Sequence, residues 1–133
     1  MSHRVLLCDD EIHILKAAEI KLKRAGFDVV CAADGQEAWE EIERQCPDLL
    51  VTDCQMPRLD GFGLVDKVRA CHSTSHLPIL MLTAKGFEFQ HQDVARRWGI
   101  KAILAKPFSP RQLLKHVEDV LAGNEIEHPV MQI

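Results

Sequence analysis

Five short apolar runs alternate with amphipathic stretches along this chain of 133 residues, and this alternation constrains the fold more than any other feature. The runs cover residues 4–8, 28–32, 48–52, 78–82 and 101–105. They are nearly free of polar residues, which is typical of parallel strands buried on both faces. A helix after each strand predicts right-handed crossovers and helices on both sides of the sheet. The expected fold class is therefore α/β, a doubly wound (βα)5 three-layer sandwich with a five-stranded parallel sheet.

Helical periodicity marks the segments that follow the strands. Residues 11–25 carry one apolar face, and Gly26 suits the end of such a helix. The inward residues expected in this helix are Ile14, Ala18, Leu22 and Ala25. Further helices are expected after the Asp34–Gly35 turn, over residues 63–71 and 88–98, and after the N-cap and first-turn pair Ser109–Pro110.

Length and charge limit the class of protein. The length suits one domain, expected over residues 1–122, and the remaining tail, 123–133, is too short for an output domain. The net charge of −4 gives no electrostatic footprint for nucleic acid, so direct nucleic-acid binding is not expected. No apolar stretch approaches the roughly 20 residues that span a bilayer, and the first residues do not resemble a signal peptide. Five cysteines without a CxxC pair suit buried thiols in a cytoplasmic protein.

Carboxylates follow two of the predicted strands. Asp9 and Asp10 follow the first strand, and Asp53 follows the third. The carboxyl ends of parallel strands meet at one edge of the sheet, where open α/β folds bind their ligands. Three negative charges at one place repel each other and raise their pKa values unless a cation offsets them. Because hard oxygen ligands favour Mg²⁺, we expect that ion here, with Mn²⁺ as an alternative.

Two further polar side chains follow strands at the same edge. Thr83 follows the fourth predicted strand and Lys106 the fifth. A hydroxyl and an ammonium opposite a metal ion suit a tetrahedral anion. The edge is therefore expected to bind a phosphoryl group, with a carboxylate available as nucleophile.

These residues stand in four short motifs that are specific together, although each alone would be weak. The motifs are Asp9–Asp10, Asp53–Cys54–Gln55–Met56–Pro57 followed by Asp60–Gly61, Thr83–Ala84–Lys85, and Lys106–Pro107–Phe108. Over residues 4–122 the chain resembles the CheY-like receiver domain of bacterial two-component response regulators. The resemblance implies a flavodoxin-like sheet with strand order 2-1-3-4-5.

The resemblance also implies a role for each acid at the edge of the sheet. Asp53 would be the phosphoacceptor and would contact Mg²⁺. Asp10 would bind the metal directly, Asp9 would act partly through water, and Gln55 would contribute its backbone carbonyl. The phosphoryl donor would be a phospho-histidine on a sensor histidine kinase or on a histidine phosphotransfer protein.

The resemblance assigns further roles around the phosphoryl group. Thr83, with its neighbour Ala84, would bind a phosphoryl oxygen, and Lys106 would pair with the carboxylate or the phosphoryl charge. The Lys106–Pro107 peptide bond would be cis. Family members usually carry a switch aromatic where this chain has Ile103. The readout through the face of the fourth helix, fifth strand and fifth helix is therefore expected to differ.

The expected function is a phosphorylation-dependent switch that changes partner binding, with no enzymatic role beyond self-phosphorylation and slow autodephosphorylation. Gln55 and Lys85 flank the site and are candidates for tuning hydrolysis, and a contact from Lys85 to phosphate would slow it. Two contexts stay open. The chain could stand alone and act on a downstream protein, or it could be part of a larger regulator with an output domain.

Two other classes of protein use related folds. Aspartate-nucleophile phosphohydrolases need a second acid two residues after the nucleophile, whereas Asp53 is followed by Cys54 and Gln55. A flavin carrier needs a first loop rich in hydroxyl and N–H donors for phosphate, whereas residues 9–11 are all acidic and would repel it. The sequence disfavours both alternatives.

Overall fold

A five-stranded parallel sheet forms the centre of the protein. The computed structural model describes residues 3–84 and 92–123. The strands are β1 (Arg4–Cys8), β2 (Asp28–Ala32), β3 (Leu49–Asp53), β4 (Ile79–Ala84) and β5 (Ala102–Lys106). Their order is β2-β1-β3-β4-β5, and all pairs are parallel. The predicted fold class and strand order are confirmed.

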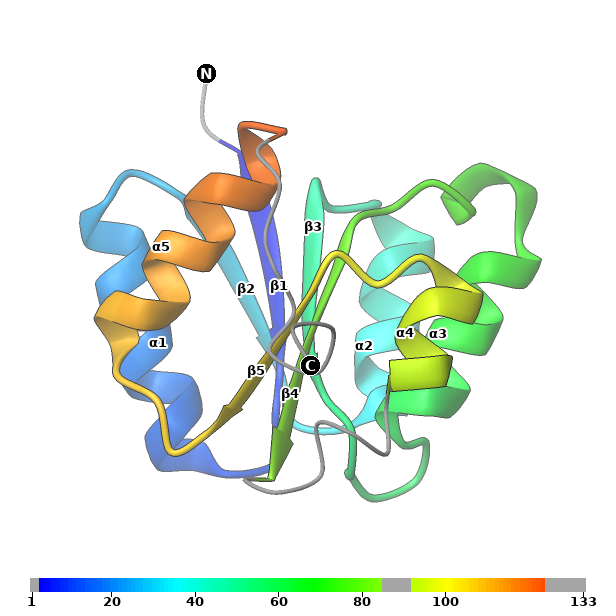
Figure 1. The fold of residues 1–133 in the computed structure, drawn as a ribbon, viewed down its shortest axis with the longest axis horizontal. Coiled ribbons are helices and arrows are strands. Elements are labelled where there is room, and N and C mark those ends of the chain that lie inside the picture. Colours follow the sequence, from blue (N-terminus) through cyan, green and yellow to red (C-terminus); the bar gives the residue numbers. More distant parts are fainter. Residues whose placement is uncertain (1–2, 85–91, 124–133) are drawn as a thin grey trace.

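Helices cover both faces of the sheet, as Figure 1 shows. They are α1 (Ile12–Arg24), α2 (Gly35–Arg44), α3 (Gly61–Ala70), α4 (Gln92–Trp98) and α5 (Pro110–Leu121), with a short 3₁₀ helix η1 (His72–Thr74) after α3. Helices α1 and α5 lie on one side, and α2, α3 and α4 lie on the other. This arrangement is the expected three-layer sandwich. No helix in the described part of the chain is long and apolar enough to cross a bilayer.

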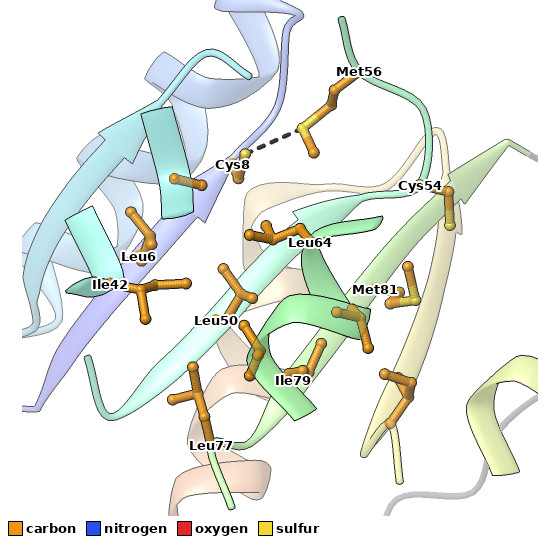
Figure 2. Close-up of a cluster of buried hydrophobic side chains, with 14 of the residues drawn as sticks. Leu6, Cys8, Ile42, Leu50, Cys54, Met56, Leu64, Leu77, Ile79 and Met81 are labelled. Carbon is orange, nitrogen blue, oxygen red and sulfur yellow. Dashed lines mark hydrogen bonds between the residues drawn. The ribbon is translucent and has the colours of Figure 1, made fainter. Parts of the chain in front are cut away.

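The period of two along each strand divides the apolar residues between two cores. Leu6, Leu50, Ile79, Met81 and Ile103 belong to the core under α2, α3 and α4, part of which Figure 2 shows. The alternate strand residues belong to the core under α1 and α5, with the helix residues Leu22, Leu113 and Val117. These residues of the second core are Val5, Leu7, Leu49, Val51, Leu80, Leu82, Ala102 and Leu104.

Several element boundaries differ from the sequence prediction. Helix α3 begins at Gly61 rather than 63, because the Asp60 side chain accepts a hydrogen bond from Gly63 N at 2.8 Å and caps the helix two residues earlier. Ala25 was expected on the inner face of α1. It is exposed, because the helix ends at Arg24. The predicted cap of α5 is confirmed, and Ser109 forms a reciprocal capping box with Gln112.

Two predicted segments lie wholly or partly outside the described residues. The helix expected over residues 88–98 is seen from Gln92 onward. Residues 124–133 of the expected tail also lie outside the described ranges. The division into a domain over 1–122 and a tail therefore stays a prediction.

Candidate functional site

The period of two along the strands also decides which side chains meet at the carboxyl edge of the sheet. Every second side chain of a strand points toward α1 and α5. On that face, β1 is followed by Asp9, β3 ends with Asp53, and β5 ends with Lys106. On the opposite face, which packs against α2, α3 and α4, lie Cys54 directly after β3 and Thr83 near the end of β4. Asp53 and Lys106 are the last residues of their strands rather than the first residues of loops, so the sheet itself holds both side chains.

Three carboxylates gather at this edge, which we call the acidic edge: Asp9, Asp10 and Asp53. One ligand oxygen from each lies within 4.8 Å of the others. Asp9 and Asp53 are buried, with exposed fractions of 1% and 7%, whereas Asp10 is exposed. Asp9 Oδ1 accepts a hydrogen bond from Glu11 N at 2.9 Å, which fixes the loop after β1. The predicted convergence of the acids is what the structure shows.

Lys106 lies among these acids and forms three ion pairs. Its Nζ is 2.9 Å from Asp9 Oδ2, 3.2 Å from Asp53 Oδ2 and 2.8 Å from Glu11 Oε1. Burial disfavours the ammonium charge, but the hydrogen bond to Glu11 and the charges of Asp9 and Asp53 outweigh it. The pKa of Lys106 is therefore raised, and the side chain stays charged at neutral pH.

The negative charges of the two buried acids, Asp9 and Asp53, are less well compensated than the positive charge of Lys106. Burial raises the pKa of Asp9, and this effect outweighs the hydrogen bond from Glu11 N and the attraction of Lys106. Burial, followed by the charge of Asp9, raises the pKa of Asp53. One lysine therefore does not offset the repulsion between the carboxylates, and the site favours an additional cation.

The donor atoms at the acidic edge fit a hard divalent cation. Among the described residues, the buried Asp9 Oδ2 has Lys106 Nζ, 2.9 Å away, as its polar partner, and Lys106 also pairs with Asp53 and Glu11. A buried carboxylate oxygen that shares its counter-charge in this way favours a further cation. Carboxylates are the ligands that Mg²⁺ prefers. Asp9, Asp10 and Asp53 would hold such an ion, and Gln55, exposed in the loop after β3, is near enough in sequence to add its carbonyl.

The loop after Asp53 is anchored on the neighbouring strand and loop. Figure 2 shows Met56 beside Cys8 at the end of β1, with the Cys8 thiol donating to Met56 Sδ at 3.1 Å. Arg58 lies in the left-handed region, with φ of 66°, and donates two hydrogen bonds of 3.1 Å to the Asp34 carboxylate. Asp34 in turn caps α2. These contacts hold the loop that follows the candidate nucleophile.

A glycine lets α3 approach the end of β3. A Cβ atom on Gly61 would lie 2.1 Å from the Asp53 carbonyl oxygen, much closer than atoms can approach. Gly61 N instead donates a hydrogen bond of 2.9 Å to Cys54 O. The Asp60–Gly61 motif therefore caps α3 and also brings it against the backbone of Asp53.

The two predicted switch residues, Thr83 and Ile103, are both buried. Thr83 is buried, and its side chain forms a hydrogen bond with Cys54. Burial raises the pKa of the Cys54 thiol to about 12, so this cysteine is poorly suited to sensing oxidants. Ile103 is buried opposite Met81 in the core under α4. Ile103 is therefore a core residue and does not lie on the surface.

The remaining predicted site residues lie at the acidic edge or outside the described residues. Ala84 is exposed and pairs with Lys106 in the sheet. The peptide bond between Lys106 and Pro107 is cis. Lys85 lies outside the described residues.

Sequence reasoning missed Glu11 as a partner of Lys106. From the sequence, Glu11 is expected in the acidic loop after the first strand and at the start of the first helix, without a partner. Its position directly after Asp9 and Asp10 was a usable signal, because a residue in that loop lies at the same edge as the fifth strand. The structure shows its carboxylate 2.8 Å from Lys106 Nζ.

Comparison with known proteins agrees with this geometry. Residues 5–118 match the family model of the response regulator receiver domain. The chain belongs to the response regulator receiver domain family. Receiver domains are signalling switches of two-component systems that respond to phosphorylation, and this chain has their fold and their cluster of acids.

Individual relatives cover nearly the whole chain. The alkaline phosphatase synthesis transcriptional regulatory protein PhoP of Bacillus subtilis is 38% identical over 97% of this chain. Among solved structures, the chemotaxis response regulator CheY4 of Vibrio cholerae has a TM-score of 0.84 and 35% identity, covering 90% of this chain and 99% of its own. The Francisella response regulator 1452 receiver domain has a TM-score of 0.82 and 29% identity, covering 92% of this chain and 98% of its own.

Some relatives that contain a receiver domain are longer than this chain. The chain spans 52% of PhoP, and about half of the other transcriptional regulators it matches. Its match to CheY4 covers nearly all of that protein. The relatives named here are regulators rather than enzymes.

Proposed function

We propose that Asp53 accepts a phosphoryl group from a phospho-histidine donor and that Asp9 and Asp10, with the Gln55 carbonyl, hold the Mg²⁺ that this reaction needs. The observation that carries the proposal is the meeting of three carboxylates and one lysine at the end of β3, with Asp53 and Asp9 both buried. Asp53 is the member that ends the central strand, and its Oδ2 is in contact with Lys106 at 3.2 Å.

The reaction is a displacement at phosphorus. A carboxylate oxygen of Asp53 attacks, an O–P bond forms and the P–N bond of the phospho-histidine breaks. The imidazole leaves with the electron pair and takes up a proton from solvent, and the product is an acyl phosphate on Asp53. Bound Mg²⁺ would supply positive charge beside the phosphoryl oxygens. Lys106 pairs with the transferred group and Thr83 donates a hydrogen bond to it.

Release of existing contacts would convert this reaction into a signal. Before phosphorylation, Lys106 forms ion pairs with Asp9, Glu11 and Asp53. The Thr83 side chain is hydrogen-bonded to Cys54. A phosphoryl group at Asp53 competes for both donors. A shift of Thr83 along β4 would be transmitted to α4 and β5, and so to the face formed by α4, β5 and α5.

Ile103 occupies the position of the family's usual switch aromatic, so the readout of this chain is expected to differ. A buried isoleucine packed opposite Met81 has no polar end to turn between surface and core. We expect the switch here to work by repacking α4 against β5 rather than by rotation of an aromatic ring.

The partners follow from the chemistry. The donor would be a sensor histidine kinase or a histidine phosphotransfer protein, and the phosphorylated form would act on an output domain or a separate protein target. The length of the transcriptional regulators supports the first context, and the match to CheY4 over its full length supports a separate target. The hydrolysis-tuning role of Gln55 and Lys85 is part of the same proposal.

Incubation with acetyl phosphate tests the proposal. Wild-type protein should be phosphorylated in the presence of Mg²⁺ and not in EDTA, as measured by Phos-tag electrophoresis. Asp53→Asn should abolish the modification, and Asp10→Asn should strongly slow it. Asp66→Asn, which removes an exposed acid on α3, is the matched control and should be modified at the wild-type rate. Undiminished modification of Asp53→Asn would refute the assignment of Asp53.

A further inference from the structure

A hollow lies at the opposite edge of the sheet from the acidic edge. It is formed by the residues that enter β4 and β5 together with the ends of α3 and α4, and its volume is about 350 Å³. We call it the basic hollow. Four basic side chains line it, Arg69, His76, Arg97 and Lys101, with Pro78 and Trp98 among its other walls. No aspartate or glutamate of the described ranges lines it.

Arg69 lines the basic hollow, and its guanidinium is only partly hydrogen-bonded within the described residues. Its Nε donates to Trp98 O at 2.7 Å, and its Nη1 donates to Ser75 O at 3.0 Å and Leu77 O at 2.7 Å. A guanidinium carries five N–H donors, so the two on Nη2 have no partner within the part of the chain that the structure describes. All the partners of Arg69 found there are neutral carbonyls.

Within the described residues, no negative charge therefore compensates the guanidinium of Arg69. The residue is half-buried, and burial lowers the pKa of its guanidinium, with no carboxylate of the described residues close enough to raise it. A half-buried charge that meets only neutral carbonyls keeps part of its desolvation cost. An anion in the basic hollow would remove this cost and occupy the free donors on Nη2.

Arg97 and Lys101 add positive charge at the mouth of the basic hollow. Both are exposed, and neither side chain forms an ion pair among the described residues. The chain as a whole carries a net charge of −4, so the charge of the basic hollow is opposite in sign to the net charge of the protein. Positive charges that converge from α3, α4 and the start of β5 suit a compact anion with several negative oxygens.

We propose that the basic hollow binds an organic phosphate of nucleotide size. Arg69 Nη2, Arg97 and Lys101 would bind the phosphate oxygens. Trp98, half-buried, and Pro78 would contact the apolar part of the ligand. The volume lies at the lower end of the range of small-molecule pockets, roughly 300–1,000 Å³, which fits a small ligand better than an extended macromolecule. This site is independent of the phosphoryl chemistry proposed for Asp53.

The two tryptophans allow a direct test, because only Trp98 lines the basic hollow. In the Trp39→Phe variant, Trp98 is the sole tryptophan, so its fluorescence reports on the basic hollow. ADP should change this fluorescence saturably in the presence of EDTA, which removes any metal from the acidic edge. Calorimetry should give the same affinity, and pyrophosphate should bind more weakly because it lacks the apolar group.

Charge removal provides the decisive comparison. The double variant Arg97→Gln, Lys101→Gln should weaken ADP binding by about tenfold or more. Arg96→Gln is the matched control, because Arg96 is an exposed arginine on the same helix that does not line the basic hollow, and it should bind within about twofold of wild type. The proposal is overturned if ADP does not bind saturably or if the double variant binds like wild type. Pyrophosphate binding as tightly as ADP, or selective binding of a polyglutamate peptide, would also overturn it.

Discussion

Lys106 is the residue on which the charge balance of the acidic edge depends. Its single ammonium faces Asp9, Glu11 and Asp53, with Asp10 in the same cluster. One positive charge against four carboxylates leaves a deficit that a divalent cation would reduce. The proposed phosphoryl group on Asp53 would compete with Glu11 for this lysine.

The raised pKa of Asp53 leads to a prediction about stability. The folded protein holds the proton on Asp53 more tightly than the unfolded chain does, because burial and the charge of Asp9 disfavour the carboxylate. Ionised Asp53 therefore destabilises the fold at pH values above its folded pKa, and this cost disappears below the ordinary aspartate pKa of about 3.9. Asp53→Asn should be more stable than wild type at pH 7 without metal, and the difference should shrink as the pH falls.

Urea denaturation in EDTA between pH 7 and pH 4 measures this difference in the free energy of unfolding. Asp66→Asn, at an exposed position on α3, is the control and should differ from wild type by less than about 0.5 kcal/mol at pH 7. A lower stability of Asp53→Asn at pH 7, or a difference that does not change with pH, would contradict this interpretation.

At the scale of elements, the position of α3 depends on Gly61. A Cβ atom there would lie 2.1 Å from the Asp53 carbonyl oxygen, which is part of the backbone and cannot move without shifting β3. Gly61→Ala should therefore destabilise the fold by about 2 kcal/mol and slow the phosphorylation of Asp53, as measured by denaturation and by acetyl phosphate labelling.

Gly63 on the same helix provides a matched control. A Cβ atom on Gly63 would approach Leu59 Cδ1 at 2.7 Å, but that atom is the end of a flexible side chain. Gly63→Ala should change stability by less than about 1 kcal/mol and leave phosphorylation near the wild-type rate. Equal effects of the two substitutions would show that helix propensity, rather than the contact with Asp53, is responsible.

Element boundaries were the least predictable part of the fold. The apolar runs located all five strands, but β4 extends to Ala84 and β3 includes Asp53, beyond the last apolar residue of each run. Polar residues at strand ends belong to the sheet here because neighbouring strands continue to pair with them, as Asp53 does with Leu82. Such pairing depends on the register of the neighbouring strand, which one segment of sequence does not contain.

At the scale of the whole molecule, topology explains most of what could be predicted about the site. Once five parallel strands are expected, their carboxyl ends must share an edge, so Asp9, Asp10, Asp53 and Lys106 were expected to meet. The position of Glu11 after Asp10 indicates only that it lies near this edge, because its contact with Lys106 depends on how the loop after β1 turns. The basic hollow was also missed, because its basic residues come from four separate segments with no common motif.

Asp53 is the residue proposed to carry the phosphoryl group. Borohydride reduction of protein treated with acetyl phosphate and Mg²⁺ converts a phosphorylated aspartate into homoserine, which peptide mass spectrometry can locate. Homoserine is expected at position 53 and nowhere else. Homoserine at Asp9 or Asp10, or none at position 53 in protein shown to be phosphorylated, would contradict it.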